Sequence, residues 1–484
     1  MDPERSAAER PGRTASPRGA ALAPSLHFLG AARTVTGSRF LVDSLRARVL
    51  LECGLFQGLK SLRLRNWAPF PVDPRSIHAV VLSHAHLDHS GYLPALVAQG
   101  FEGPVFCTAN TAALCRILLP DSGRLQEEDA AYANRKGYSK HEPALPLYTE
   151  ADAECALRRF RALDFGAPQE VAPGIRATLS RAGHILGSAS VRLDLDDGDA
   201  ESVFFSGDLG RPRHPILLPP EPPPRCGTLL VESTYGGRRH DEASAERVLA
   251  DAIVRTAGRG GAVVIPAFAV DRTEVLLLTL RRLEASGRIP HLPVYVDSPM
   301  ALASLQVYER AAAAGDPEIR PELRGRGNPF DPRDLIEARD VAASKAIHDA
   351  KLPAVIVSAS GMATGGRVLH HLARRLPDPR NAIVLVGFQA AGTRGRALLE
   401  GAPALKLLGR YVPVRAEIVD AGGFSVHADE PEILDWLAQA PAAPRAVFAV
   451  HGEPEASSAL QHAIARQTGW SAVVPQDGER VRLD

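Results

Sequence analysis

The chain has 484 residues, which is long enough for two domains with buried cores. Lys and Arg number 56, as do Asp and Glu, so the formal net charge is zero and nucleic-acid binding by bulk positive charge is excluded, although a local basic cleft is not. The five scattered cysteines form no C-x-x-C pair, which is typical of a reducing compartment, and no apolar run approaches the length of a membrane helix, so we expect a cytoplasmic protein with no membrane partner.

The first part of the chain is typical of meandering strands. Residues 1–24 lack the continuous apolar segment of a secretory signal, and we expect a disordered tail there. Apolar or alternating runs then predict strands, and Asp196-Asp197-Gly198 between two runs predicts a hairpin. The expected strands are 26–30, 38–42, 47–51, 188–195 and 202–206. With a helix expected at 93–99 and partly exposed helices across 121–160, this pattern predicts two sheets sandwiched between helices.

A second region, starting near Gly236, alternates helices with strands. Such alternation predicts a parallel sheet with crossover helices. The helices are expected at 242–256 and 272–286, and the strands at 262–266, 293–297, 354–358 and 383–388. Short strands return after about residue 405, at 417–419 and 446–450. We therefore predict a sandwich over 25–235, an inserted α/β domain over 236–404, and the rest of the sandwich over 405–484.

The most informative segment is Ser83-His84-Ala85-His86-Leu87-Asp88-His89, directly after an apolar run. Its three histidines and one aspartate fall within six positions, at His84, His86, Asp88 and His89. Imidazole suits zinc and carboxylate suits harder cations, so this set can hold two metals side by side. Without metal, it would crowd polar groups that burial penalises. A close pair of metals indicates hydrolysis of an ester or phosphodiester.

Three later residues extend this ligand set. His184 precedes a predicted strand, whereas Asp208 and His451 follow one. A lone histidine or aspartate at a strand end is structural more often than not. Their recurrence favours a common site, because strand ends on one edge of a sheet can converge.

The order of these motifs resembles that of the metallo-β-lactamase superfamily. The later segments resemble its β-CASP branch, which includes bacterial ribonucleases and the endonuclease subunit of the polyadenylation machinery. Matching stretches run from Gly30 to Glu453, so the resemblance covers all but the N-terminal tail. It implies an α/β protein, an αββα sandwich with an inserted β-CASP domain whose sheet is mainly parallel. It also implies two Zn²⁺ ions per chain, with Mn²⁺ as the alternative, and a bridging hydroxide as nucleophile.

By position, the resemblance implies a role for each ligand. His84, His86 and His184 bind one ion, Asp88, His89 and His451 bind the other, and Asp208 bridges the two.

The resemblance also implies catalytic residues beyond the metal ligands. His427 is expected to act as general acid and Glu232 to orient it; Asp208 is counted with them as the bridging carboxylate. The alternative for Glu232 is a helix-capping or loop carboxylate. Glu52 stands where the family commonly has aspartate, and is expected to orient ligands without binding metal.

Substrate phosphates are expected to contact the inserted domain. The loop 358–367 follows a predicted strand and can present backbone N–H groups to an anion. The expected phosphate-binding residues are Ser360, Gly361, Thr364, Gly365, Gly366, Arg272 and Arg394. Arg394 and Arg396 are alternatively ordinary surface arginines, and His240, His370 and His371 are weaker candidates. The family often has glycine at Asp271, an acid that could weaken phosphate binding or pair with Arg272.

These features predict a zinc-dependent ribonuclease that cleaves single-stranded RNA in RNA processing or decay. His451 favours RNA, since DNA-repair members of the branch tend to carry an apolar residue there. One alternative is a metallo-hydrolase of a small ester or thioester, which leaves Glu232, His427 and the insertion without a role. Another is an inactive partner subunit of an RNA-processing complex, which the filled ligand positions argue against. Homodimerisation and the choice between internal and terminal cleavage stay open.

Overall fold

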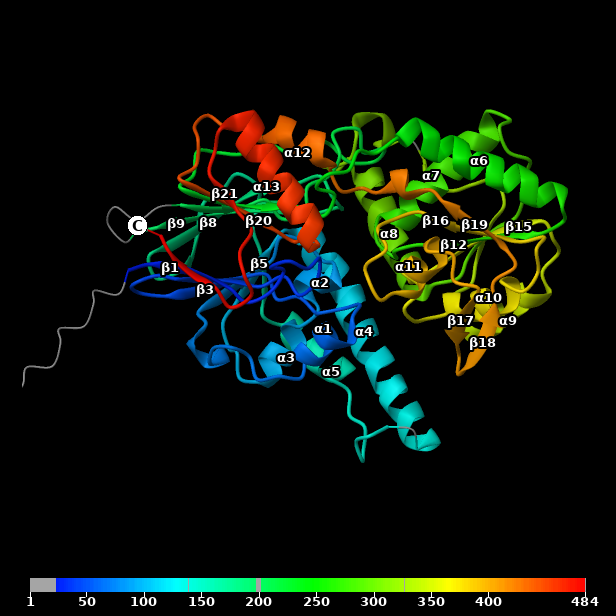
Figure 1. Cartoon of the computed structure of the whole chain (residues 1–484), viewed down its shortest axis with the longest axis horizontal. Coiled ribbons are helices and arrows are strands. Elements are labelled where there is room, and N and C mark those ends of the chain that lie inside the picture. The colour runs from blue at the N-terminus through cyan, green and yellow to red at the C-terminus, as the bar shows by residue number, and fades with distance from the viewer. Residues whose placement is uncertain (1–22, 138, 197–201, 326, 484) are drawn as a thin grey trace, which may run out of the picture.

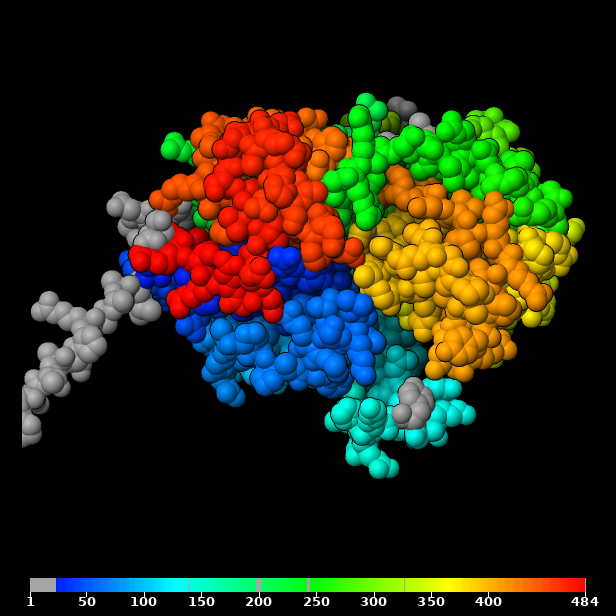
Figure 2. Space-filling view, in the orientation of Figure 1, coloured from blue at the N-terminus to red at the C-terminus, as the bar shows by residue number. Residues whose placement is uncertain are grey.

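The fold comes from a computed structural model, which describes residues 23–137, 139–196, 202–325 and 327–483. Two lobes lie side by side: a sandwich built from both ends of the chain, and an inserted lobe coloured from green to orange (Figure 1). They meet along a seam where red-orange and blue segments of the sandwich face yellow segments of the inserted lobe (Figure 2). Most of the tail expected at 1–24 and most of the hairpin turn after Asp196 lie outside the described residues.

The sandwich contains two seven-stranded sheets. In the first, the strand order is β22-β1-β2-β3-β4-β5-β6, with bounds β1 Ser25–Phe28, β2 Phe40–Asp43, β3 Arg48–Leu51, β4 Ala79–Val81, β5 Val105–Cys107, β6 Phe160–Ala162 and β22 Arg480–Arg482. In the second, the order is β21-β20-β11-β10-β9-β8-β7, with bounds β7 Gln169–Ala172, β8 Ile175–Arg181, β9 Ala189–Leu195, β10 Val203–Phe205, β11 Thr228–Glu232, β20 Ala446–Val450 and β21 Ala472–Val473. The expected hairpin strands, β9 and β10, pair antiparallel as predicted.

Apolar side chains from the two sheets interdigitate to form the core of the sandwich. The ring of Phe28 lies 5.0 Å from that of Phe448 on the facing sheet, and Phe40 lies 5.2 Å from Phe205, measured between centroids. Alternate strand residues point outward and are covered by helices, as the sequence pattern predicts. The helices of this lobe are α1 Lys60–Arg65, α2 Leu87–Ser90, α3 Leu93–Ala98, α4 Ala109–Lys136, α5 Glu150–Leu157, α12 Glu430–Leu437 and α13 Pro454–Thr468, with a 3₁₀ turn η1 at Pro74–Ser76. The expected helical segment 121–160 is thus interrupted between α4 and α5.

The inserted lobe contains a six-stranded parallel sheet in the order β14-β13-β15-β12-β16-β19. Its bounds are β12 Ala262–Pro266, β13 Val294–Val296, β14 Leu335–Glu337, β15 Ala354–Ser358, β16 Ala382–Leu385 and β19 Glu417–Asp420, beside a hairpin of β17 Ala404–Leu407 and β18 Arg410–Pro413. Its helices are α6 Glu242–Gly258, α7 Arg272–Ala285, α8 Pro299–Ala314, α9 Val341–Ala346, α10 Val368–Arg375 and α11 Arg394–Leu399, with 3₁₀ turns η2 Pro321–Leu323, η3 Ile347–Asp349 and η4 Gly422–Phe424. The central strands are buried on both faces, which explains their continuous apolar sequences.

The end of the inserted lobe differs from the sequence prediction. The strand β19 pairs in parallel with β16, so it belongs to the inserted sheet and not to the sandwich. The boundary expected between 404 and 405 therefore cuts through this lobe, and strand pairing favours a boundary after Asp420. A four-residue strand carries no sequence signal for the sheet that it joins, because its pairing partner is set by tertiary structure.

Candidate active site

The candidate ligands converge because neighbouring strands end at one edge. The parallel strands β10, β11 and β20 lie side by side, with Glu232 in register with Val450. Asp208 follows β10, Glu232 ends β11, and His451 follows β20. In the facing sheet, β4 leads into His84 and then into the short helix α2. Four segments far apart in sequence therefore contribute to a single site.

We define the first cluster as His84, His86, His184 and Asp208. The Nδ1 atom of His86 lies 3.1 Å from Nε2 of His84 and 3.3 Å from Nε2 of His184. Asp208 Oδ2 lies 3.5 Å from His84 Nε2 and 3.7 Å from His184 Nε2. Two ligands of one tetrahedral zinc ion, each at about 2.0–2.2 Å, lie about 3.3–3.6 Å apart, so these spacings suit a shared ion.

The second cluster comprises Asp88, His89 and His451. The Nε2 atom of His451 lies 3.1 Å from Nε2 of His89 and 3.6 Å from Oδ2 of Asp88. Asp208 contacts this cluster too, because its Oδ2 is 3.3 Å from His89 Nε2 and its Oδ1 is 3.4 Å from His451 Nδ1. One carboxylate therefore touches both clusters, which is the arrangement that a bridging ligand requires.

Burial keeps the three imidazoles of the first cluster in their neutral, metal-binding form. It lowers the pKa of His86 to about 4 and lowers the pKa values of His84 and His184 well below their ordinary value. Burial acts to raise the pKa of Asp208, but the neighbouring histidines, His451 foremost, hold it well below its usual range. Asp208 Oδ1 is buried without a hydrogen-bond partner. Buried polar atoms of this kind need a partner, and a cation fits this donor set.

Glu52 orients one histidine of the second cluster. Its Oε2 atom lies 2.5 Å from Nδ1 of His89, and its Oε1 accepts the backbone N–H of Ser83 at 2.5 Å. The bond at Nδ1 directs the opposite ring atom, Nε2, toward Asp208 and His451. Glu52 and His451 both have positive φ angles, of 65° and 51°, so strained backbone helps to fix the site.

His427 and Glu232 form a pair beside the first cluster. The Nδ1 atom of His427 lies 3.3 Å from both oxygens of Glu232. Leu209 N–H and the Thr234 hydroxyl each donate to Glu232 at 2.6 Å, so the carboxylate is fixed. Burial acts to lower the pKa of His427, but the Glu232 carboxylate raises it above its ordinary value. Glu232 ends a strand and caps no helix, so the helix-capping alternative does not apply.

The expected phosphate loop lies between β15 and α10. The Ser360 hydroxyl accepts the backbone N–H of Thr364 at 3.1 Å and lies 2.9 Å from its Oγ1. Gly366 adopts φ of 75°, which lets the loop turn into the helix. Arg394 donates to the carbonyl oxygens of Ala363, Thr364 and Lys406, so its hydrogen bonds favour bracing this loop over binding phosphate.

Arg272 differs from Arg394 in having no partner for its buried nitrogens. The residue is 4% exposed, and neither its Nε nor its Nη1 atom makes a hydrogen bond. A buried guanidinium without partners is costly, and an anion at this place would remove that cost. Of the weaker candidates, His371 is bonded to Asp297 at 2.6 Å in the inserted lobe, away from both clusters, and His370 is exposed on the same helix.

Sequence reasoning missed a buried hub around Asp271. Arg272 N–H bonds to Val270 O at 2.8 Å, which makes a γ-turn with Asp271 at φ of 67°. The Asp271 carboxylate does not pair with the arginine as the sequence allowed. It lies 3.0 Å from Nε2 of His214 and accepts the Tyr308 hydroxyl at 2.8 Å.

The hub also reaches the loop of a metal ligand. The Tyr308 oxygen accepts the backbone N–H of Leu186 at 2.9 Å, two residues beyond His184. Since Ile216 and Leu217 donate to Nδ1 of His214, the proton of that ring faces Asp271. The unusual acid beside Arg272 was visible in the sequence, but nothing in the sequence pointed to His214 or Tyr308.

Three known domains match the chain in order: a Beta-lactamase superfamily domain at 39–219, a Beta-Casp domain at 273–398, and a Zn-dependent metallo-hydrolase RNA specificity domain at 411–475. Ribonuclease TTHA0252 of Thermus thermophilus is 39% identical, over 93% of this chain and 98% of its own length. The chain belongs to the β-CASP branch of the metallo-β-lactamase superfamily. This membership implies metal binding.

More distant relatives also match most of this chain. Transcription termination factor FttA of Methanocaldococcus jannaschii is 30% identical, over 94% of this chain and 71% of its own length. FttA of Methanothermobacter thermautotrophicus is 32% identical, over 95% and 71%. A crystal structure from Enterococcus faecalis V583, titled a protein of unknown function, shares the fold with a TM-score of 0.51 at 16% identity, covering 96% of this chain and all of its own. Among the described residues, no helix is long and apolar enough to span a membrane.

Proposed function

We propose that this β-CASP protein is a zinc-dependent ribonuclease that hydrolyses phosphodiester bonds of single-stranded RNA in RNA processing or decay. The observation that carries the proposal is the position of the His427–Glu232 pair beside Asp208, with His427 Nδ1 3.9 Å from Asp208 Oδ2. A small-ester hydrolase would need the clusters alone. Support for RNA comes from a matched domain described by RNA specificity and from a relative named as a ribonuclease.

The two clusters would hold one Zn²⁺ ion each, with Mn²⁺ as the alternative. His84, His86 and His184 hold one ion, and Asp88, His89 and His451 hold the other, with Asp208 shared between them. When bound, such a pair supplies an acidified water as nucleophile and offsets negative charge on the phosphate. Both clusters are rich in imidazole, which favours zinc over harder cations.

His427 donates the proton that the leaving oxygen needs. Glu232 accepts from Nδ1 of His427, which keeps a proton on that atom and leaves Nε2 to face the substrate. The carboxylate raises the pKa of the imidazole, so the protonated acid is more populated than in a free histidine. Leu209 and Thr234 hold Glu232 in place, so the orientation of the pair costs little at the moment of reaction.

Arg272 and the phosphate loop bind phosphates of the RNA backbone. The buried guanidinium of Arg272 gains the anionic partner that it lacks within the protein. The loop from Ser360 to Gly366 contributes backbone N–H groups and hydroxyls. Arg394 supports this loop from behind.

We also propose a cytoplasmic location, supported by five free cysteines, four of them buried. Homodimerisation stays a prediction.

A cleavage assay tests the proposal. Zinc-loaded protein is incubated with 5′-labelled single-stranded RNA or the matching DNA, beside Asp208→Ala and, as a matched control, Asp331→Ala at an exposed site. We expect RNA cleavage by the wild type and Asp331→Ala and none by Asp208→Ala, and the product ladder separates internal from terminal cuts. Intact RNA beside verified zinc would contradict the proposal and favour the small-ester hydrolase or the inactive partner subunit.

A further inference from the structure

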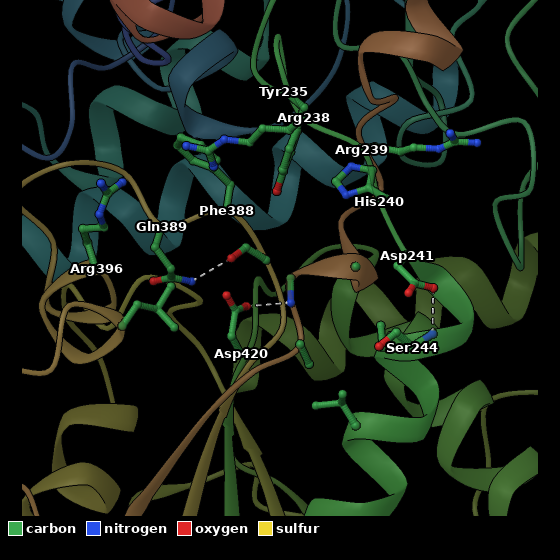
Figure 3. A pocket seen from close by; sticks show the side chains of 17 residues that line it. Tyr235, Arg238, Arg239, His240, Asp241, Ser244, Phe388, Gln389, Arg396 and Asp420 are labelled. Atoms are coloured by element: carbon green, nitrogen blue, oxygen red, sulfur yellow. Dashed lines mark hydrogen bonds between the residues drawn. The ribbon is translucent and has the colours of Figure 1, made fainter.

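A pocket of about 460 Å³ opens beside His427 at the seam between the lobes, and neither metal cluster contributes to it. We call it the Tyr235 pocket. Its walls come from the segment 235–241 before α6, from 387–389 after β16, from α11, and from 420–423 around η4. Figure 3 shows Tyr235, Arg238 and His240 along one edge, with Gln389 and Arg396 along another.

Tyr235 forms the wall that the pocket shares with the proposed catalytic pair. Its ring centroid lies 6.0 Å from that of His427, 4.3 Å from that of His240, and 5.7 Å from that of Phe388 in an edge-to-face contact. The pocket therefore begins one aromatic ring away from the group that would protonate the leaving oxygen.

The same pocket also borders Arg272. A Cβ atom added to Gly387 would lie 3.8 Å from the unpartnered Nε of Arg272 and 3.4 Å from the ring of Phe268. Gly387 is thus placed between the pocket and the buried guanidinium that we assign to an RNA phosphate. An RNA strand with a phosphate bound at Arg272 can therefore place an adjacent nucleotide in the Tyr235 pocket.

The chemistry of the lining suits a nucleotide. Phe388 is partly exposed and offers an aromatic ring on which a base can stack, and the nearly buried ring of Tyr235 packs edge-to-face against it. His240 adds a ring nitrogen, Nε2, that is buried and has no hydrogen-bond partner. Burial lowers the pKa of His240 to about 4, so the ring is neutral and Nε2 can hydrogen-bond a base edge.

Charges at the opening suit a phosphate next to that base. Arg238 and Arg239 are exposed, and their guanidinium groups make no ion pair within the described part of the chain, whereas Arg396 pairs with Glu400. Two acids also line the pocket, but Asp241 accepts the N–H of Ser244 and Asp420 accepts that of Gly422. Each acid is therefore held by a backbone N–H, and the three arginines of the lining still outnumber its two aspartates.

We propose that the Tyr235 pocket binds the nucleotide that carries the leaving oxygen, with its base on Phe388 and an adjoining phosphate on Arg238. This inference rests on the proposed function, because it takes His427 as the general acid. It assigns a binding role to side chains that contact neither cluster. Because stacking is tolerant of base identity, the pocket gives affinity with weak base preference.

The test compares two substrates. One is a single-stranded RNA, and the other is bis(4-nitrophenyl) phosphate, a diester with neither a base nor a flanking nucleotide. The variants are Phe388→Leu, which keeps apolar volume but removes the π-face, and Arg238→Gln, with Arg333→Gln as a matched exposed control in the same lobe. We expect both pocket variants to lower kcat/KM for RNA about tenfold or more, mainly through KM, and to leave diester hydrolysis within about twofold of wild type.

Single abasic nucleotides placed along the RNA test the position. Wild-type cleavage should fall when the abasic nucleotide carries the leaving oxygen, and Phe388→Leu should show no additional loss there. Equal losses on both substrates would overturn the proposal, since the variants would then act through the catalytic centre. Unchanged RNA cleavage would overturn it as well.

A direct titration separates this proposal from the ribonuclease assignment. Calorimetry should detect binding of adenosine 5′-monophosphate to the wild type and weaker binding to Phe388→Leu, with inorganic phosphate unable to displace it. If phosphate competes equally well, the pocket binds an anion and the nucleotide assignment is wrong. If the wild type hydrolyses neither substrate, the ribonuclease proposal fails, and this titration alone decides whether the pocket is a nucleotide site.

Discussion

Replacing Asp271 by glycine tests how firmly the inserted lobe is joined to the metal-ligand loop. The carboxylate accepts from Tyr308 and contacts His214, and Tyr308 in turn holds the backbone of Leu186 beside His184. Glycine removes both contacts and leaves two buried donors without acceptors. It also relieves the strained backbone at φ of 67°, which glycine adopts without penalty.

These two effects have opposite signs, and the hydrogen bonds should dominate. Bonds to a charged acceptor contribute about 1.5–3 kcal/mol each, whereas a strained backbone conformation costs about 1–3 kcal/mol. We therefore expect Asp271→Gly to destabilise the protein by about 3 kcal/mol. At about 2–4 °C per kcal/mol for a domain of this size, the Tm should fall by roughly 6–12 °C.

Thermal unfolding of the zinc-loaded protein measures this effect. Tyr308→Phe is the matched comparison, because it removes one donor to the carboxylate and the acceptor of Leu186 N–H, and it keeps the backbone strain. We expect it to lower the Tm by an amount similar to that of Asp271→Gly, and the double variant to lose less than the two single effects together. An unchanged or higher Tm for Asp271→Gly would refute the reasoning, because relief of the backbone strain would then equal or exceed the loss of the two hydrogen bonds to the carboxylate.

Three further changes probe the site and its pH dependence. Glu52→Gln should weaken zinc affinity about 10- to 100-fold in a chelator competition, since His89 loses its orienting carboxylate, and an unchanged affinity would contradict that role. His427→Gln should lower RNA cleavage about 10²- to 10⁴-fold at unchanged zinc content; undiminished cleavage would show that another group donates the proton. Burial raises the pKa of Glu318 from 4.5 to about 7, so its neutral form is favoured in the fold. The resulting stability is fully present below pH 4.5 and is lost as the pH rises through about 7, by up to about 3 kcal/mol. Glu318→Gln removes the titrating group, so the Tm of this variant should change less across this pH window than the Tm of the wild type. An equally steep profile of Tm against pH would contradict the assignment.

Most of the predicted site residues follow from local sequence patterns. The ligand run from His84 to His89 is contiguous, and its chemistry can be read without a fold. His184, Asp208 and His451 required the further step that strand ends converge, and the structure brings them within ligand distance of that run. The resemblance supplied the pairing of His427 with Glu232, which 195 positions separate.

The missing parts depend on contacts between distant segments. His214 and Tyr308 are ordinary in sequence and become a hub only where Asp271 lies between them. The same holds for β19, whose four residues join the inserted sheet through β16. Phe388 and Tyr235 likewise form one pocket wall only after the lobes meet. Sequence patterns report the secondary structure that a segment prefers, whereas these features depend on the residues that the segment contacts in the folded protein.

The order in which the ligands occur along the chain has a consequence for synthesis. The segment from His84 to Asp208 is made before the inserted lobe, whereas His427 and His451 are made after it. Nascent chains fold from the N-terminus, so an unfinished chain holds most of the candidate metal site but lacks His427, the proposed proton donor. A nuclease of this design would therefore be unable to cut the message that encodes it until translation has passed beyond the inserted lobe.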